Sequence, residues 1–126
     1  MSSSLILQRL SINNNNPEVL NKPEEFLGPN YKEVLKFWNK IEKMSEEQLR
    51  PVNERYYAFY YENRSERYKA VNLAYEASWE VVGEDNANNA AWAALIVTKS
   101  YTALYATREL IGGVENPVFL KMFDNL

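Results

Sequence analysis

The 126-residue sequence contains no cysteine and no histidine. The chain can therefore form no disulfide, no zinc site with nitrogen or sulfur ligands, and no nucleophile activated by histidine. The carboxylate-bridged di-iron sites of helical bundles need Glu-x-x-His motifs and are excluded for the same reason. Glycine occurs at only four positions, and none of them belongs to a glycine-rich phosphate loop. These absences favour a protein that is not an enzyme and that binds no cofactor and no metal.

Carboxylates are the acid–base groups that remain. Glu76 and Glu80 are one helical turn apart, and Glu84 follows four residues later. Paired carboxylates carry out general acid–base catalysis in many enzymes. Carboxylates on an amphipathic helix more often belong to its solvated face, and we interpret these three in that way. An enzyme that uses only carboxylates and tyrosines is thus the third alternative.

A long hydrophobic run is also missing. Residues 1–10 contain too short an apolar stretch for a signal peptide, and the longest run of small and apolar residues, 90–97, is far shorter than the roughly 20 residues of a membrane-spanning helix. The net charge is only −3, with +1 in residues 1–75 and −4 in residues 76–126. We therefore expect an intracellular, cytoplasmic protein with no membrane partner. Nonspecific DNA binding is not favoured, because it requires a basic domain.

Aromatic residues, in contrast, make up 13% of the chain, and hydrophobic residues make up 46%. A disordered chain would be poor in both, so most of the sequence is expected to fold, and its length suits a single domain. The helical spacing of apolar residues predicts an all-α fold, a small helical bundle of four main helices. The expected ranges are 31–44, 46–63, 66–82 and 87–111, followed by a short C-terminal helix from Asn116-Pro117 to about Asp124.

Helix ends are marked by capping residues and glycines. The pairs with capping-box spacing are Asn30 with Glu33 and Ser45 with Gln48. Gly83 and Gly112-Gly113 suit the C-terminal position where φ is positive. Pro51 lies too deep for the first turn of its helix, so we expect a break or a kink there. The helix at 87–111 is rich in alanine and apolar all round in its first half, which is typical of a central, buried helix.

Residues 1–30 are expected to form an irregular N-terminal arm, and residues 31–126 to form the bundle domain. The arm is polar, rich in asparagine and carries three prolines. No helical periodicity extends through it. It nevertheless contains Leu5, Ile6, Leu7 and Leu10, which would suit docking on a neighbour, with the arm as an auxiliary strap.

A tyrosine cluster is the most informative local feature. Five aromatic residues fall within six positions: Tyr56, Tyr57, Phe59, Tyr60 and Tyr61. They cannot all point into one core. Tyr57, Tyr61 and Arg64 recur at i, i+4 and i+7 on a face of their own, while the other three aromatics form a core stripe. Tyrosine with arginine is the composition of interface hot spots, so we predict partner binding by Tyr57, Tyr61 and Arg64 unless neighbouring helices or the arm cover both faces.

A lysine ridge is the second candidate surface. Lys32, Lys36, Lys40 and Lys43 lie within about 80° of the helix circumference. Ammonium groups on one ridge could contact phosphates or an acidic protein. Acidic residues flank the ridge, and lysine on a solvated face is the simpler interpretation. The alternative function is therefore a nucleotide-binding or nucleic-acid-binding protein that uses Lys32, Lys36 and Lys40 together with the Tyr/Arg cluster.

Three short segments and a Phe-containing tail carry a faint resemblance. The segments are Ala74-Tyr-Glu-Ala-Ser-Trp-Glu80, Ala90-Ala-Trp-Ala-Ala94 and Arg108-Glu-Leu-Ile-Gly112. Over residues 70–123 the chain resembles uncharacterised Ala/Trp-rich helical proteins of phages and large DNA viruses. The resemblance implies a viral or phage source, with the host cytoplasm or the virion as location, and assigns no function to any residue.

The leading hypothesis is a non-enzymatic protein–protein interaction or assembly protein. Its partner would be another protein or a second copy of the chain. A self-complementary use of the face that carries Tyr57, Tyr61 and Arg64 predicts a homo-oligomer, most simply a two-fold dimer.

Overall fold

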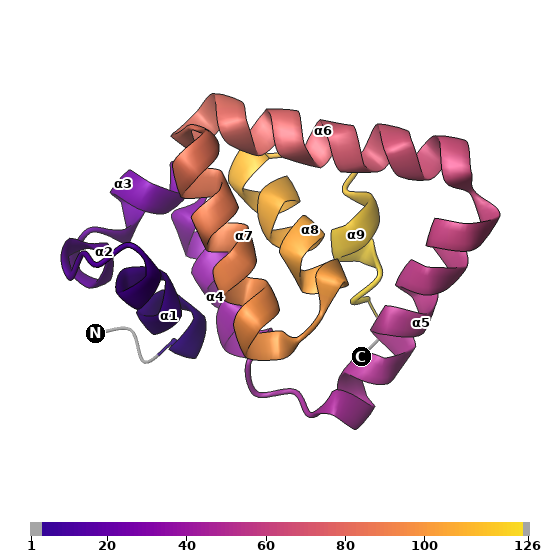
Figure 1. Cartoon of the computed structure of the whole chain (residues 1–126), viewed down its shortest axis with the longest axis horizontal. Coiled ribbons are helices and arrows are strands. Elements are labelled where there is room, and N and C mark those ends of the chain that lie inside the picture. The colour runs from indigo at the N-terminus through magenta and orange to yellow at the C-terminus, as the bar shows by residue number, and fades with distance from the viewer. Residues whose placement is uncertain (1–3, 125–126) are drawn as a thin grey trace.

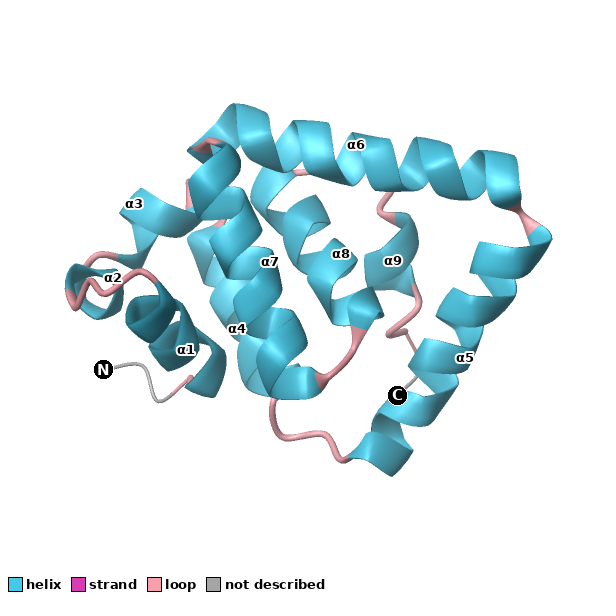
Figure 2. Cartoon of the chain, viewed as in Figure 1, coloured by secondary structure: helices cyan, strands magenta, loops and turns pink. Residues whose placement is uncertain are grey.

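The computed structural model describes residues 4–124, and that part of the chain consists of helices and turns with no strand (Figures 1 and 2). The predicted all-α fold class is confirmed. The helices, in chain order, are α1 (Leu5–Asn13), α2 (Glu18–Asn21), α3 (Pro23–Leu27), α4 (Tyr31–Ile41), α5 (Glu46–Glu62), α6 (Arg64–Val82), α7 (Glu84–Thr98), α8 (Tyr101–Gly112) and α9 (Val118–Lys121).

Helix α8 occupies the centre, where α4, α5, α6, α7 and α9 contact it. In Figure 1, α6 lies along the top and α5 descends at the right, so these two helices form two sides of a frame around α8 and α9. Helix α7 lies beside α8, and α1 and α3 pack against α7 from the other side. In this arrangement, α5 lies at the edge of the molecule and contacts α8.

Helix α8 is buried on nearly every side. Its buried residues are Thr102, Ala103, Leu104, Ala106, Thr107, Arg108, Glu109 and Ile111. Thr107 accepts a hydrogen bond of 3.0 Å from Nε1 of the buried Trp38 of α4. The closest approach is at Gly112, where a Cβ would lie 2.5 Å from Ala77 Cβ and 2.9 Å from Ser78 N of α6. Only glycine therefore fits where α6 and α8 meet.

Residues 5–27 do not form the predicted irregular arm. Helices α1 to α3 contribute side chains that are at most 1% exposed to the same core as the other helices: Ile6, Leu7, Leu10, Val19 and Leu27. The start of α1 is held by Glu42, whose Oε2 accepts hydrogen bonds from Ser4 Oγ at 3.0 Å and Ile6 N at 3.1 Å. The prediction failed because these helices have nine, four and five residues, too few for a helical period to show. Residues 1–3 of the predicted arm lie outside the described residues.

The single helix predicted over 87–111 is also wrong, because the chain breaks at Lys99 and Ser100. Lys99 adopts a left-handed conformation with a φ of 58°, and Ser100 Oγ caps α8 by accepting a hydrogen bond from Ala103 N at 3.3 Å. Thr98 Oγ1 supports the turn by accepting a hydrogen bond from Ser100 N at 3.2 Å. Apolar, alanine-containing sequence continues on both sides, so composition hides the break. Helices α7 and α8 consequently pack against each other instead of forming one rod.

The predicted helix ends have mixed outcomes. The capping box that begins at Ser45 is confirmed, and Gly113 ends α8 with a φ of 65°. Asn30 makes no side-chain cap, because its Nδ2 donates instead to Leu110 O at 3.1 Å and so ties the start of α4 to the end of α8. A break or a kink was predicted at Pro51, and α5 continues through this residue without a break.

Gly112→Ala tests the close approach of α6 and α8. The added methyl group would overlap Ala77 and the backbone of Ser78, so α6 would have to move. We expect a net loss of about 2 kcal/mol, because overpacking outweighs the better helix propensity of alanine, and a melting temperature lower by roughly 8 °C. Thermal unfolding followed by circular dichroism measures this. Asn72→Ala, on the exposed face of α6, is the control, and an alanine at position 112 that melts like the wild type would contradict the close approach.

Candidate functional site: a tyrosine cleft

A cleft of about 380 Å³ lies between α5 and α8. The residues that line it are all tyrosines: Tyr56, Tyr57, Tyr60 and Tyr61 of α5, and Tyr101 and Tyr105 of α8. Residues four positions apart lie on the same side of a helix, so the spacing of these tyrosines directs them in pairs toward the space between the two helices. This feature is termed the tyrosine cleft below.

The tyrosine cleft has a buried floor and an exposed rim. Tyr56, at the floor, is 8% exposed, whereas Tyr57 and Tyr61 at the rim are 53% and 75% exposed. Tyr101, on the opposite wall, is 48% exposed. Rings exposed to this extent offer both an apolar surface and a hydroxyl group to whatever enters the cleft.

The cleft rings belong to a continuous series of ring contacts that crosses α5, α8 and α6. The centroid distances are 5.1 Å for Tyr61–Tyr60, 6.0 Å for Tyr60–Tyr56, 6.0 Å for Tyr56–Tyr105, 6.2 Å for Tyr105–Tyr75 and 5.5 Å for Tyr75–Trp79. All fall within the range in which aromatic pairs attract each other. The contact between Tyr56 of α5 and Tyr105 of α8 in this series therefore helps to fix the position of one wall of the cleft relative to the other.

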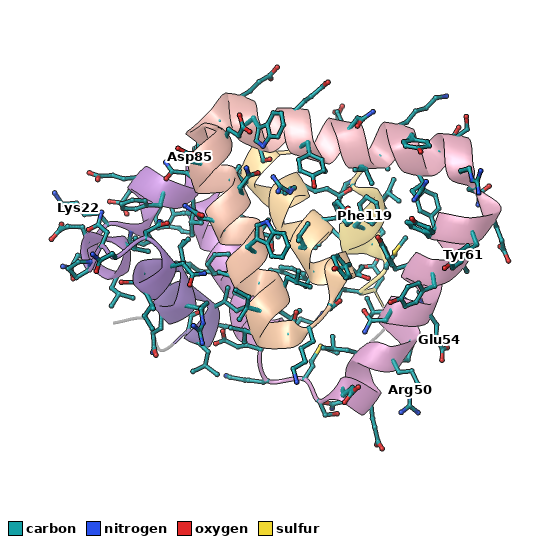
Figure 3. The ribbon with its side chains drawn as sticks, in the orientation of Figure 1. Lys22, Arg50, Glu54, Tyr61, Asp85 and Phe119 are labelled. Atoms are coloured by element: carbon teal, nitrogen blue, oxygen red, sulfur yellow. The ribbon has the colours of Figure 1, made fainter. Side chains whose placement is uncertain are left out.

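Phe119 of α9 supports the floor of the cleft. Its ring centroid lies 4.8 Å from that of Tyr105 and 6.0 Å from that of Tyr56. Figure 3 labels Phe119 on α9, inside the frame formed by α5 and α6, and Tyr61 on α5. The floor therefore depends on the placement of a helix of only four residues.

Glu109 of α8 holds that short helix in place. Its carboxylate is 3% exposed and accepts backbone hydrogen bonds from Val118 at 2.8 Å, Phe119 at 3.2 Å and Leu120 at 2.8 Å. Burial raises the pKa of Glu109, and the three N–H donors and Lys121 offset part of that rise. The carboxylate thus satisfies the free N–H groups at the start of α9.

The buried phenols of the cleft remain neutral. Burial raises the pKa of Tyr56 and of Tyr105. Tyr105 and Tyr60 raise the pKa of Tyr56 further, and Tyr75 raises that of Tyr105, whereas Tyr56 acts to lower the pKa of Tyr105. Both hydroxyl groups therefore stay protonated at neutral pH, where they donate and accept hydrogen bonds rather than act as bases.

Arg67 of α6 places a guanidinium group beside the cleft. Its Cζ lies 3.8 Å from the ring centroid of Tyr60 and 4.7 Å from that of Tyr68. Its Nε is buried without a hydrogen-bond partner. Within residues 4–124 the one ion pair joins Lys69 to Glu66, so no carboxylate neutralises Arg67 there.

Arg108 of α8 places a second guanidinium group near the inner end of the ring series. The side chain is 1% exposed, and its Cζ lies 4.0 Å from the ring centroid of Tyr75. Nη2 donates to Asn88 Oδ1 at 3.0 Å, but Nε and Nη1 are buried without partners. Burial lowers the pKa of Arg108, and Tyr75 and Tyr105 act in the opposite direction. Since arginine stays protonated in proteins, the chain buries a positive charge that no carboxylate of residues 4–124 pairs with.

The structure separates the residues that the sequence predicts for partner binding. Tyr57 and Tyr61 line the tyrosine cleft. Arg64 is exposed as the first residue of α6 but is not part of the cleft lining. Of the three aromatics expected in the core, Tyr56 is buried and Phe59 is partly buried, whereas Tyr60 is 36% exposed.

The lysine ridge belongs to a different surface. Lys32, Lys36 and Lys40 are exposed on α4, which contributes nothing to the cleft lining. Lys36 and Lys40 border a separate hollow of about 280 Å³ together with Glu33, Phe37, Leu110 and Leu120. The ammonium group of Lys32 lies 6.0 Å from the ring centroid of its neighbour Tyr31.

Sequence reasoning missed half of the site. Tyr101 and Tyr105 form the wall opposite α5, and Arg67 and Arg108 supply the positive charges. The spacing of four residues between Tyr101 and Tyr105 was the available signal, but a single buried helix over 87–111 conceals it. Nothing in the sequence indicates that these two arginines lack carboxylate partners, because the partners of a side chain depend on how the helices pack against one another.

Residues 4–124 contain no group of three or more acidic side chains arranged to hold a metal ion. Nor does any helix in this range combine the length and apolar character needed to cross a bilayer.

Arg108→Met tests the cost of the unpaired charge. Methionine replaces the guanidinium group with an apolar chain of similar reach, and exchanging buried charge for apolar volume is often stabilising. We expect a gain of about 1–2 kcal/mol and a melting temperature higher by roughly 4–8 °C. Arg108→Ala is the matched control, which should melt below the methionine variant because it leaves a cavity. A methionine variant less stable than the wild type would show that the contacts with Tyr75 and Asn88 outweigh the desolvation of the charge.

Glu109→Gln tests the raised pKa of the buried carboxyl group. The folded state binds this proton more tightly than the unfolded chain, so the stability from Glu109 is complete below its ordinary pKa of 4.5 and is lost as the pH rises through the raised value. The wild type should therefore lose stability relative to Glu109→Gln, which cannot ionise, as the pH rises from below 4.5 through the raised pKa. Urea unfolding of both proteins at successive pH values measures the difference.

A stability difference that is constant or that grows with pH would contradict the raised pKa. Glu109→Ala serves as the second comparison. It leaves three backbone N–H groups without an acceptor and should cost about 3 kcal/mol at low pH. Because alanine cannot ionise, this cost should shrink with rising pH as the wild type loses stability.

A scan against protein-family models, a search of curated proteins and a search of solved structures each found no match to this chain.

Proposed function

We propose that this is a non-enzymatic protein–protein interaction protein whose partner, another protein or a second copy of the chain, binds at the tyrosine cleft. The exposed rim carries the proposal. Tyr57, Tyr61 and Tyr101 keep between 48% and 75% of their surface exposed while their neighbours form the floor. Tyrosine supplies large contact area at a low cost in conformational entropy, and it is enriched among interface hot spots.

The surrounding surface extends this aromatic area. Tyr68 of α6 is 61% exposed and contacts the guanidinium group of Arg67. Contiguous exposed apolar surface with polar groups at its edge marks interaction sites on soluble proteins. The raised pKa values of Tyr56 and Tyr105 leave the floor of the cleft without a group that exchanges protons at neutral pH.

Charge supports a protein partner over nucleic acid. The whole chain carries a net charge of −3, and binding to nucleic acid depends largely on neutralising phosphates. The lysine ridge of α4 borders its own hollow and not the tyrosine cleft. Stacking on tyrosine alone, without a basic path beside it, is weak support for single-strand binding.

The double variant Tyr57→Ala with Tyr61→Ala tests the proposal. Both residues are exposed, so the circular dichroism and the melting temperature should stay as in the wild type. Partner binding should weaken by more than about 2 kcal/mol, or roughly 30-fold. Quantitative capture from the source lysate measures binding to other proteins, and light scattering of the purified chain measures self-association.

The control is Leu5→Ala with Ile12→Ala, which removes exposed apolar side chains from α1 on the other side of the molecule (Figure 1). This variant should keep the partner. Equal binding by both double variants would contradict a function at the tyrosine cleft.

A further inference from the structure

We infer that the partner inserts an acidic segment into the tyrosine cleft and pairs one of its carboxylates with Arg67. The inference rests on the proposed function and specifies the chemistry of the partner. It follows from three features of the cleft: a guanidinium group held without a counterion, a positive local charge, and a lining of hydroxyl donors.

Arg67 is positioned for a carboxylate before any partner arrives. Its guanidinium group packs against the rings of Tyr60 and Tyr68, at 3.8 and 4.7 Å from their centroids. These contacts restrict the side chain, so pairing costs little further conformational entropy. Its Nε is buried, but the residue as a whole is partly exposed, so the side chain is not closed off from a partner. A guanidinium group can donate two parallel hydrogen bonds to one carboxylate.

The formal charges beside the cleft are positive. Burial, the largest cause, raises the pKa values of Tyr56 and Tyr105, whereas Arg67 acts to lower that of Tyr56 and Arg108 acts to lower that of Tyr105. Among residues 4–124, no carboxylate lines the cleft. The nearby Glu66 is engaged by Lys69 at 3.5 Å. An anion entering a cleft of this kind meets attraction that the chain itself does not neutralise.

The cleft lining offers contacts to both the carboxylate and the methylene groups of an acidic side chain. Tyrosine hydroxyls at the rim, such as those of Tyr57 and Tyr61, can donate hydrogen bonds to carboxylate oxygens. The ring faces can pack on the methylene groups of a glutamate. A peptide segment needs only one or two such pairs, whereas a nucleic acid strand needs a row of basic groups along its backbone, and the described lining of the cleft consists of tyrosines.

Binding of labelled hexaglutamate, measured by fluorescence anisotropy at low salt, tests the inference. Hexaglutamine, of equal length and no charge, and a single-stranded oligothymidine serve as comparison probes. Hexaglutamate should bind at least about tenfold more tightly than hexaglutamine, because charge-assisted hydrogen bonds contribute on the order of 1.5–3 kcal/mol. Arg67→Gln should weaken it by a similar factor. Arg9→Gln, which removes an exposed arginine from α1, should leave it unchanged.

Three outcomes would overturn the inference. The first is equal affinity for hexaglutamate and hexaglutamine. The second is an equal effect of Arg67→Gln and Arg9→Gln. The third is tighter binding of the oligothymidine than of hexaglutamate, which would make the occupant a nucleic acid. If the partner of the proposed function is lost from the Tyr57→Ala, Tyr61→Ala variant but kept by Arg67→Gln, the acidic segment is wrong and the interface stands. If both variants keep the partner, both proposals are wrong.

Discussion

The buried carboxylate of Glu109 is the interaction on which the site depends. A helix of four residues has no stability of its own, because its first N–H groups lack acceptors and its nucleation is costly. Glu109 supplies the acceptors from the central helix and thereby fixes Phe119 against Tyr56 and Tyr105. Glu42 does the same for the start of α1. In both places a side chain from one helix completes the N-terminus of another, so short helices become part of a single core.

The two arginines beside the ring series, Arg108 and Arg67, differ in the surroundings that stabilise their charges. Arg108 is enclosed, and the face of Tyr75 and the side chain of Asn88 replace only part of its lost hydration. Arg67 is partly exposed and keeps some contact with water, while its guanidinium group packs against the ring of Tyr60. A charge in the first position mainly costs stability, whereas a charge in the second is available to a partner. This difference is the reason for assigning the carboxylate to Arg67 rather than to Arg108.

How well the sequence predicts each helix depends on how many periods of the helical apolar pattern that helix contains. The 17 and 19 residues of α5 and α6 show several helical periods, and their boundaries differ by at most two residues from the predicted ones. Helix α1, with nine residues, is too short to show such periods, and the break at Lys99 involves too few residues to leave a pattern. Both features depend on contacts with distant segments. The same division applies to the site. The exposed positions of Tyr57 and Tyr61 follow from spacing within one helix, while the opposite wall depends on how α5 and α8 meet.

The walls of the tyrosine cleft are held by polar contacts made from the middle of α5. Asn53 Oδ1 accepts a hydrogen bond from Ser100 Oγ at 2.7 Å, which joins α5 to the start of α8. Arg55 Nη1 donates to the carbonyl oxygens of Met122 at 2.6 Å and Asp124 at 3.0 Å, which joins α5 to the end of α9. These contacts and the ring series across the cleft keep its width defined in the isolated chain. The proposed partner would therefore meet a cleft that is already formed, and the ordering cost of binding would fall mainly on the segment that it inserts.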